Sequence, residues 1–368
     1  MSMRAISLCL TIASLTPAQT FVVDVAGGPG SQFVDLPTAV ATVPDGATLI
    51  VRSGTYVGVA IVQKSLTILA DPGTYAFGGI FVRDLLATQQ VVIRNVGVSG
   101  FSTSTLAAFD NEGVVVFDSC GTSANNPVWL NVQGSTDVRI RNCVLQYGTP
   151  LGVFTSSVRV SDCEIATTWP YSACTMVDSF AEFSDCTITA GGGSAGSSAI
   201  LGQNSQVRLL GSTVLRSGAF PNGYSGTVLT GTINVRLTPG VVLDPISGPA
   251  TTAGVTLTTI AMPSVAATTG PAGTTATATM TGPAGALAAL YISFPAPLTF
   301  VPGVVDAIAI LPGTAFLAAA GTLSPSIAAG YTVPPHPLLR GVTLTWQGAT
   351  IDATQGLQIS NAVTYVHF

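Results

Sequence analysis

The sequence has very little charge. Only 29 of its 368 residues are charged, 12 basic and 17 acidic, whereas about 25% of an ordinary soluble domain is charged. The net charge of −5 provides no basic footprint, so a nucleic-acid partner is not expected. Apolar residues make up 47% of the chain, which excludes intrinsic disorder because disorder requires low hydrophobicity and high net charge.

Long hydrophobic runs are also missing. No apolar run reaches the roughly 18 residues that a transmembrane helix needs, so no membrane span is expected in the mature chain. At the N-terminus, Arg4 precedes a short apolar stretch at residues 5–15, and small residues at 16–18 suit a cleavage site. We predict a secretory signal peptide at residues 1–18 and a secreted protein, either extracellular or held at the cell surface.

Five cysteines follow this segment: Cys120, Cys143, Cys163, Cys174 and Cys186. An odd number leaves at least one thiol unpaired. None of the five has the C-x-x-C spacing of a zinc or redox site.

One pattern, apolar-x-apolar-x-Asn/Asp-small-x-apolar, recurs along the first two thirds of the chain. Copies begin at residues 66, 91, 114, 138, 158, 181, 207 and 233. Strict alternation is typical of β-strands, and an interval of 20 to 26 residues indicates a solenoid. Each unit also has a second short β run, such as residues 128–132, and turns of Gly, Ser and Thr. These features favour a parallel β-helix of eight or nine coils over a leucine-rich repeat.

Aligning the copies predicts two columns at the turn. The inward column contains Val96, Ser119, Cys143, Cys163, Cys186 and Ser212. We predict a packed ladder of thiols there, with a disulfide between stacked neighbours as the alternative. The preceding column contains Asn95, Asp118, Asn142, Asp162, Asp185 and Gly211, which are residues that suit tight turns. A calcium site at Asp162 and Asp185 is an alternative; otherwise no cofactor or metal is expected.

The start of the repeat region resembles a known family. Residues 44–56 (PDGATLIVRSGTY) and 64–68 (KSLTI) are similar to the opening of right-handed parallel β-helix proteins of the pectin-lyase-like superfamily. The resemblance covers about residues 30–245 and implies the fold. It does not imply one activity, because lyases, hydrolases, esterases and non-catalytic members share this opening. Just before it, the spacing of Leu36, Ala39, Val40 and Val43 predicts a short helix that covers the open first coil.

Composition changes near residue 245, where we place the boundary between a β-helix domain (19–245) and a C-terminal domain (246–368). Short β runs at 288–294, 304–311, 342–346 and 357–365 predict a small antiparallel β-sandwich. Two Gly-Pro-Ala-Gly segments, at 270–273 and 282–285, predict turns or a linker-like insertion. The end of the chain is similar to a C-terminal module of secreted bacterial proteins. We expect this domain to cover the last coil.

The catalytic devices of the superfamily are missing. The histidines, His336 and His367, lie outside the β-helix domain, so neither a Gly-His-Gly segment nor a His-dependent triad can be assembled within it. Lys64 is the single lysine, and we interpret it as a coil-edge residue. The acidic candidates for a catalytic pair are Asp178, Glu182 and Glu164.

Arginine placement is uneven. Six arginines fall on outward positions of one strand column: Arg94, Arg139, Arg141, Arg159, Arg208 and Arg236. A guanidinium is a planar, permanently charged fork, so this stripe predicts binding to carboxylates or sulfates of an anionic polysaccharide. The alternatives are a solvated face paired with Asp137 and Glu182, or an arginine acting as an elimination base. Trp129, Trp169 and Tyr171 either stack on sugars or pack.

The sequence therefore favours a secreted β-helix protein that acts as a non-catalytic structural or glycan-binding module, with an extracellular polysaccharide or cell-surface component as partner. A divergent polysaccharide lyase or glycoside hydrolase is the alternative. A scaffold that binds another protein is the third hypothesis.

Overall fold

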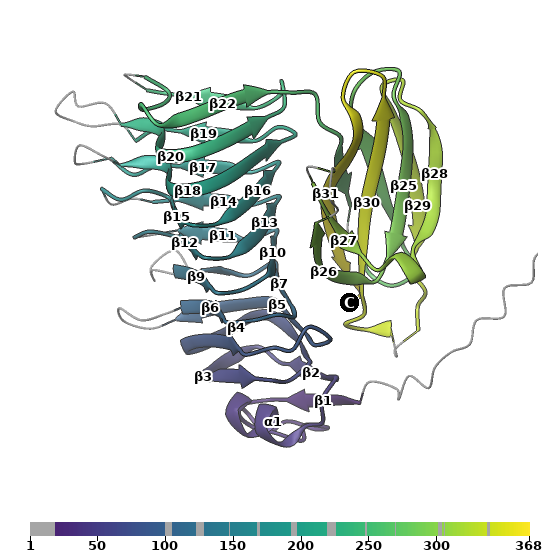
Figure 1. The fold of residues 1–368 in the computed structure, drawn as a ribbon. Coiled ribbons are helices and arrows are strands. Elements are labelled where there is room, and N and C mark those ends of the chain that lie inside the picture. The colour runs from purple at the N-terminus through teal and green to yellow at the C-terminus, as the bar shows by residue number, and fades with distance from the viewer. Residues whose placement is uncertain are drawn as a thin grey trace, which may run out of the picture.

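The computed structural model describes residues 19–99, 105–122, 129–146, 148–167, 170–192, 197–218, 226–246, 249–268, 270–300, 304, 306–336 and 339–368. Within them the chain forms a parallel β-solenoid of about eight turns, followed by antiparallel sheets (Figure 1). The predicted fold class is confirmed. The predicted signal peptide lies outside the described residues. None of the helices in the described part is long and apolar enough to cross a membrane.

A short helix closes the N-terminal end of the solenoid (Figure 1). Strand β1 (Thr20–Val23) pairs in parallel with β2 (Ala47–Val51), and α1 (Leu36–Thr42) lies between them in the chain. The Asp35 side chain caps α1 by accepting the Thr38 N–H at 2.7 Å. The predicted helix is confirmed. Lys64 donates from Nζ to the Val40 carbonyl at 2.6 Å, which is a structural role at the coil edge.

Each turn of the solenoid contributes to three parallel sheets. The first sheet contains β2, β5 (Gln90–Ser99), β7 (Val114–Asp118), β10 (Asp137–Arg141), β13 (Ser157–Ser161), β16 (Phe180–Ser184) and β22 (Val255–Thr259), with parts of β4 (Leu66–Arg83), β18 (Ser198–Leu210) and β20 (Thr227–Leu237). Because β22 continues the parallel ladder, the solenoid extends to Thr259 rather than ending near residue 245.

The other two sheets are narrower. The second contains β8 (Gly121–Thr122), β11 (Val144–Gln146), β14 (Glu164–Ala166), β17 (Thr187–Thr189), β19 (Val214–Arg216) and β21 (Val242–Asp244). The third contains β3 (Gly54–Val62), β6 (Thr105–Phe109), β9 (Trp129–Gln133), β12 (Leu151–Phe154) and β15 (Cys174–Val177). Long strands such as β4 and β18 bend from one sheet into the next.

The thiol ladder forms, with two corrections to its members. The five described cysteines are buried and none is in a disulfide. Cys120, rather than Ser119, precedes the second-sheet strand, because Val115 and not Val114 is the register partner of Val91. Ser119 therefore takes the turn position assigned to Asp118, with φ of 54°.

At the other end of the ladder, Thr213 replaces Ser212. The turn at Gly211 holds one extra residue, and Thr213 Oγ1 accepts the Cys186 N–H at 3.3 Å. In the same way, Cys163 Sγ accepts the Cys143 N–H at 3.3 Å. A small polarisable or hydroxyl group at this position thus ties one coil to the next.

The C-terminal part is a β-sandwich. One sheet has the order β23 (Ser264–Ala267), β24 (Thr275–Thr281), β29 (Ser326–Thr332). The other has the order β28 (Phe316–Thr322), β25 (Leu287–Ser293), β30 (Thr343–Asp352), β31 (Gly356–Val366). The hairpin β26 (Pro295–Phe300) and β27 (Ala307–Ile310), followed by the 3₁₀ turn Pro312–Thr314, lies beside them. The two Gly-Pro-Ala-Gly segments contain the turns on either side of strand β24, so the expectation of turns is confirmed and that of a linker-like insertion is wrong.

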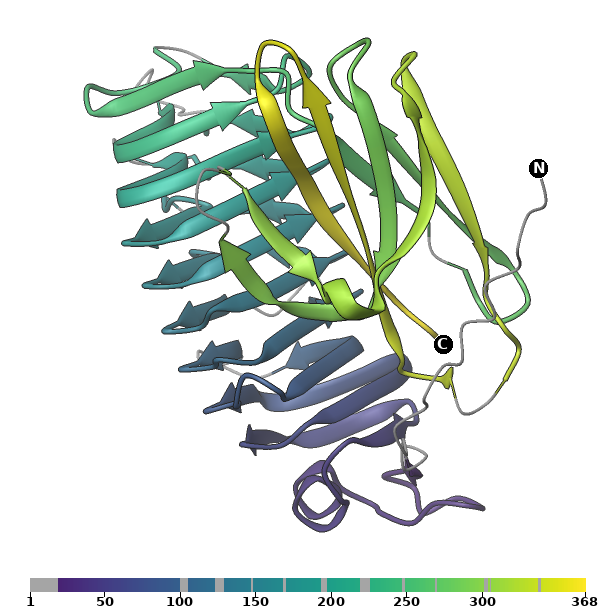
Figure 2. The same ribbon diagram turned by 45° about the vertical axis from the view of Figure 1, so that its right-hand side comes forward.

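The sandwich packs along the side of the solenoid, against the first sheet (Figures 1 and 2). Gln90 Nε2 donates to Thr343 Oγ1 at 2.8 Å near one end of the contact, and Arg208 Nη2 donates to the Ile359 carbonyl at 3.3 Å near the other. Val366 packs into an apolar cluster on the first sheet. The expectation that this domain covers the last coil is therefore wrong: the domain lies on the outward side of the first sheet, where it meets both apolar and polar side chains.

Candidate functional site

The register places the six arginines on the outward face of the first sheet, in two neighbouring rows. One row runs through Arg139, Arg159, Glu182, Arg208 and Arg236. The other contains Arg94, Asp118 and Arg141. The predicted outward placement is correct, but the predicted solvent exposure is not: Arg139, Arg141, Arg159 and Arg208 are at most 5% exposed.

Arg139 is held by both domains. Its Nε and Nη2 donate to the Asp137 carboxylate at 2.6–3.2 Å. Its remaining N–H groups donate to Thr345 Oγ1 at 2.8 Å and Thr364 Oγ1 at 3.0 Å, and to the carbonyls of two residues of the hairpin region, Ala296 and Ala309. This guanidinium is fully engaged within the protein.

Arg208 and Glu182 form a buried ion network with the sandwich. Arg208 Nη1 lies 2.8 Å from Glu182 Oε2 and 3.1 Å from Asp306 Oδ1. Arg159 Nε lies 3.7 Å from Glu182 Oε1, and burial lowers the pKa of Arg159 to about 10. Asp306 is one of only three charged residues after residue 245, and its carboxylate is placed against the solenoid.

The second row, which contains Arg94, Asp118 and Arg141, is also held by contacts within the protein. Arg141 donates from Nη1 to the Thr364 carbonyl at 2.8 Å and from Nη2 to the Ala267 carbonyl. Arg94 Nη1 lies 2.6 Å from Asp118 Oδ2, and its guanidinium carbon lies 3.7 Å from the Phe368 ring centroid. Five of the six arginines therefore form the docking surface for the sandwich: Arg94, Arg139, Arg141, Arg159 and Arg208. A polysaccharide does not reach the four that are at most 5% exposed while the two domains are docked.

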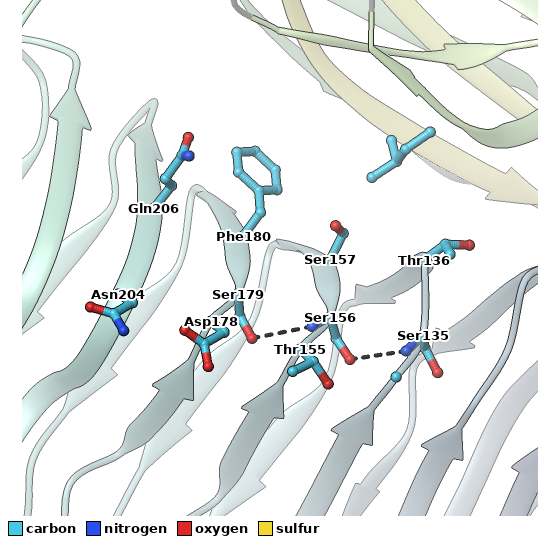
Figure 3. Close-up of a pocket in the computed structure, with 12 residues that line it drawn as sticks. Ser135, Thr136, Thr155, Ser156, Ser157, Asp178, Ser179, Phe180, Asn204 and Gln206 are labelled. Carbon is cyan, nitrogen blue, oxygen red and sulfur yellow. Dashed lines mark hydrogen bonds between the residues drawn. The ribbon is translucent and has the colours of Figure 1, made fainter.

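Beside this interface an open groove remains (Figure 3). It runs along the turns that lead from the third sheet into the first sheet, and Leu298 of β26 lies on its opposite side. The groove has two adjoining stretches, and this first one has a volume of about 460 Å³. Its polar side chains are Thr136, Thr155, Ser157, Asp178, Asn204 and Gln206, with the Phe180 ring among them.

The floor of the groove is fixed by a ladder of buried serines. Ser156 Oγ accepts the Ser135 N–H at 3.0 Å, and Ser179 Oγ accepts the Ser156 N–H at 3.2 Å. Ser205 continues the ladder by accepting the Ser179 N–H at 3.2 Å. Thr155, Asp178 and Asn204 each come just before a serine of this ladder, and their side chains lie exposed at the surface (Figure 3).

A second stretch of about 320 Å³ continues the groove along the solenoid and shares Phe180 and Gln206 with the first. Asn234, Thr256 and Thr258 line it. Arg236 also lines it, is partly exposed, and has no ion-pair partner among the described residues. The two stretches thus carry an exposed carboxylate at Asp178 and a partly exposed guanidinium at Arg236, beside amides and hydroxyls, and the buried Arg208–Asp306 ion pair borders the second stretch.

The remaining candidates are distributed as follows. Of the acidic candidates, Asp178 lies in the groove, Glu182 is buried in the ion network, and Glu164 is exposed on the second sheet. Trp129 and Tyr171 are exposed by 47% and 51%, while Trp169 lies outside the described residues. Asp137 and Glu182 do pair with arginines of this face, Asp137 with Arg139 and Glu182 with Arg159 and Arg208; the alternative of a solvated face is wrong, because these arginines are buried.

The two aspartates proposed for calcium have protein partners. Asp162 Oδ2 lies 3.5 Å from Arg141 Nε, and Asp185 Oδ1 accepts the N–H and hydroxyl of Ser212, both at 2.9 Å. Burial raises the pKa of Asp162, which disfavours its charged form. Within the described ranges, no group of three His, Cys, Asp or Glu side chains is arranged to hold a metal ion.

Sequence reasoning missed the groove residues Phe180, Asn204, Gln206 and Asn234. Phe180, Gln206 and Asn234 each lie two positions before the arginine column, and Asn204 lies two positions before Gln206. A recurrence of amide residues at that offset is the signal that would have indicated them. Compared with protein-family models and with curated proteins, the chain shows no match.

Proposed function

We propose that this protein is a secreted, non-catalytic β-helix module of the pectin-lyase-like type that binds an extended polysaccharide in the groove. The observation that carries the proposal is the groove between the solenoid turns and hairpin β26–β27, which is open and lined by amides and hydroxyls. The similarity of residues 44–56 to the superfamily and the helix-capped parallel solenoid support the family assignment.

The repeat of the solenoid suits a repeating ligand. Coils stacked about 4.8 Å apart have a spacing close to the length of one sugar unit in an extended chain, so successive units meet similar polar groups. Phe180 offers a ring for the C–H face of a sugar. Arg236 pairs with a carboxylate or sulfate on the bound chain.

A glycan array followed by affinity electrophoresis tests this proposal. We expect binding that weakens with added salt, falls about tenfold in Phe180→Ala, corresponding to about 1.4 kcal/mol, and loses its salt dependence in Arg236→Gln. The matched control is Arg216→Gln, because Arg216 is an exposed arginine on the second sheet, paired with Asp244. The proposal is overturned if the wild-type protein retains none of the tested glycans, or if both groove variants bind like the control.

The second candidate is a divergent lyase or hydrolase acting on an anionic polysaccharide. It is favoured by one observation: the Asp178 carboxylate lies exposed in the groove, where it could act as a general acid or base. Release of reducing ends or of ultraviolet-absorbing unsaturated ends, abolished in Asp178→Asn, would support it. Inactivity on pectate, alginate and glycosaminoglycans, with and without calcium, would contradict it.

A further inference from the structure

The C-terminal sandwich has an open edge on the side away from the solenoid (Figure 1). Strand β29 is an edge strand of the sheet β23-β24-β29, and β28 is an edge strand of the other sheet. β29 pairs with β24 on one side, and on its other side no strand of the described residues pairs with it. Such an edge presents unpaired N–H and C=O groups, which can pair with a strand of another chain.

The two edge strands differ in the features that protect an edge from further pairing. β28 has a bulge at Ala318, which has no partner in β25. β29 keeps an unbroken register with β24 over seven residues, and it contains neither a charged residue nor a proline. Bulges, charges and prolines are the usual protection of an edge strand, so β29 is the unprotected edge.

The hydrogen bonds just after β29 show which of its residues face outward. Val333 directs both backbone groups to the β24 side: its N–H donates to the Thr274 carbonyl at 2.8 Å, and its carbonyl accepts the Gly273 N–H at 2.9 Å. Successive residues of a strand direct these groups to opposite sides. The outward groups of β29 therefore belong to Ser326, Ala328, Gly330 and Thr332.

These four residues match one another across a twofold axis. In an antiparallel pair, two residues in a hydrogen-bonded position exchange both of their N–H···O bonds. An axis at Ala329 places Ala328 opposite Gly330, and Ser326 opposite Thr332, so all four outward residues exchange bonds with a second copy of the strand. Because β29 is uncharged, this pairing brings no like charges together.

The side chains also suit this pairing. Ile327, Ala329 and Tyr331 pack against the apolar core of the sandwich but are partly exposed. The same axis places Ile327 opposite Tyr331 of the second copy, and a pair of an aromatic and a β-branched residue stabilises antiparallel strands. On β28, Phe316 and Leu317 are 66% and 54% exposed, which adds apolar surface on the same side of the sandwich (Figure 1).

We propose that two copies of this chain pair through β29 in antiparallel orientation, with the twofold axis at Ala329, so that the sheet β23-β24-β29 continues into its symmetry mate. The partner is a second copy because this edge matches itself in hydrogen bonding, side chains and charge. An interface of this kind uses the same surface on both subunits and closes at two. The residues that line the groove do not include β29, so the pairing is independent of the proposed glycan binding.

Cross-linking tests the register, in a Cys9→Ser background. Ala329→Cys places two cysteines opposite each other in a non-hydrogen-bonded position, where the Cα atoms are about 4.5 Å apart and a disulfide can form. We expect a disulfide-linked dimer on a non-reducing gel. The matched control is Ala328→Cys, because a cysteine there lies diagonally from its copy, at about 7–8 Å, and should not cross-link. The five native cysteines of the described residues are buried and free, and should not contribute.

Analytical ultracentrifugation measures the dimer itself. With rising concentration the wild-type protein should approach the mass of two chains. Ala328→Lys should weaken the dimer at least about tenfold, because it adds a charge to the outward row of the edge. The control Ala60→Lys, which adds the same charge at an exposed alanine of the solenoid, should dimerise like the wild type. A wild-type protein that stays monomeric, a dimer that persists in Ala328→Lys, or equal cross-linking of the two cysteine variants overturns the proposal.

Discussion

Asp306 of the C-terminal sandwich places Oδ1 3.1 Å from Nη1 of Arg208 on the solenoid, and each side chain is only 5% exposed. The sandwich has few charged residues, and one of them, Asp306, forms this contact. The ion pair therefore fixes the position of the sandwich on the arginine face. A buried charge is tolerated only when it is paired and hydrogen-bonded. Docking therefore adds the Asp306 carboxylate to the ion network that Arg159, Glu182 and Arg208 form on the solenoid.

Removing Asp306 should destabilise the protein strongly. In Asp306→Ala, Arg208 and Arg159 keep only Glu182 as their shared carboxylate, and breaking a buried pair typically lowers the free energy of unfolding by about 3–5 kcal/mol. Urea denaturation of the wild type and the variant measures this loss of free energy. The control is Asp244→Ala, whose partner Arg216 is 51% exposed and which should cost less than about 1 kcal/mol. Equal losses in both variants would show that the interface is not desolvated.

Close approach of coils should make one glycine intolerant of substitution. In Gly58→Ala the new Cβ would be 2.2 Å from the Gly79 carbonyl oxygen, so the free energy of unfolding should fall by about 1–3 kcal/mol. Gly121→Ala is the matched control, because its Cβ would meet its nearest neighbour at 4.0 Å. Chemical denaturation compares the two. A Gly58→Ala protein as stable as the control would contradict the coil spacing described here.

The thiol ladder should be inert in the folded protein. Burial raises the pKa of the Cys143 and Cys163 thiols, and the thiolate is the reactive form. In a Cys9→Ser variant, Ellman's reagent should therefore label none of the five ladder and core thiols until denaturant is added, and then label five. Fast labelling of the native protein, or fewer than five thiols after unfolding under non-reducing conditions, would contradict this prediction.

Stability should decrease on mild acidification because of His367. Its ring contacts the Tyr331 hydroxyl at 3.1 Å and the Val342 carbonyl at 2.8 Å, and burial lowers its pKa. The unfolded chain then binds the proton more readily, so stability is lost as pH falls through the unfolded value of about 6.5. Denaturation between about pH 8 and pH 5.5 measures this slope. His367→Gln should flatten it; an unchanged slope would assign the effect to another group.

The solenoid was predictable because its strands repeat locally: apolar and polar residues alternate in the strands, and the strands recur at a regular interval. The start of α1 also has local signals, the N-cap residue Asp35 and Pro37 in the first turn. The register at Ser119 was misplaced because four consecutive apolar residues, Val114–Phe117, fit two alignments equally well. Strand β24 was missed because Thr and Ala give no strong alternation signal. Docking of the sandwich, and hence burial of the arginines and formation of the groove, depends on contacts between residues more than 100 positions apart, which no local pattern encodes.

The location of a bound glycan tests the central claim most directly. A photoreactive oligosaccharide from the class that ranks highest on the array would be cross-linked to the wild-type protein, and the labelled peptides identified by mass spectrometry. The account predicts labels at residues 134–136, 155–157, 178–180, 204–206 and 234–236, together with Leu298 on the hairpin. Labels confined to the second-sheet strands at 144–146, 164–166 and 187–189 would contradict it.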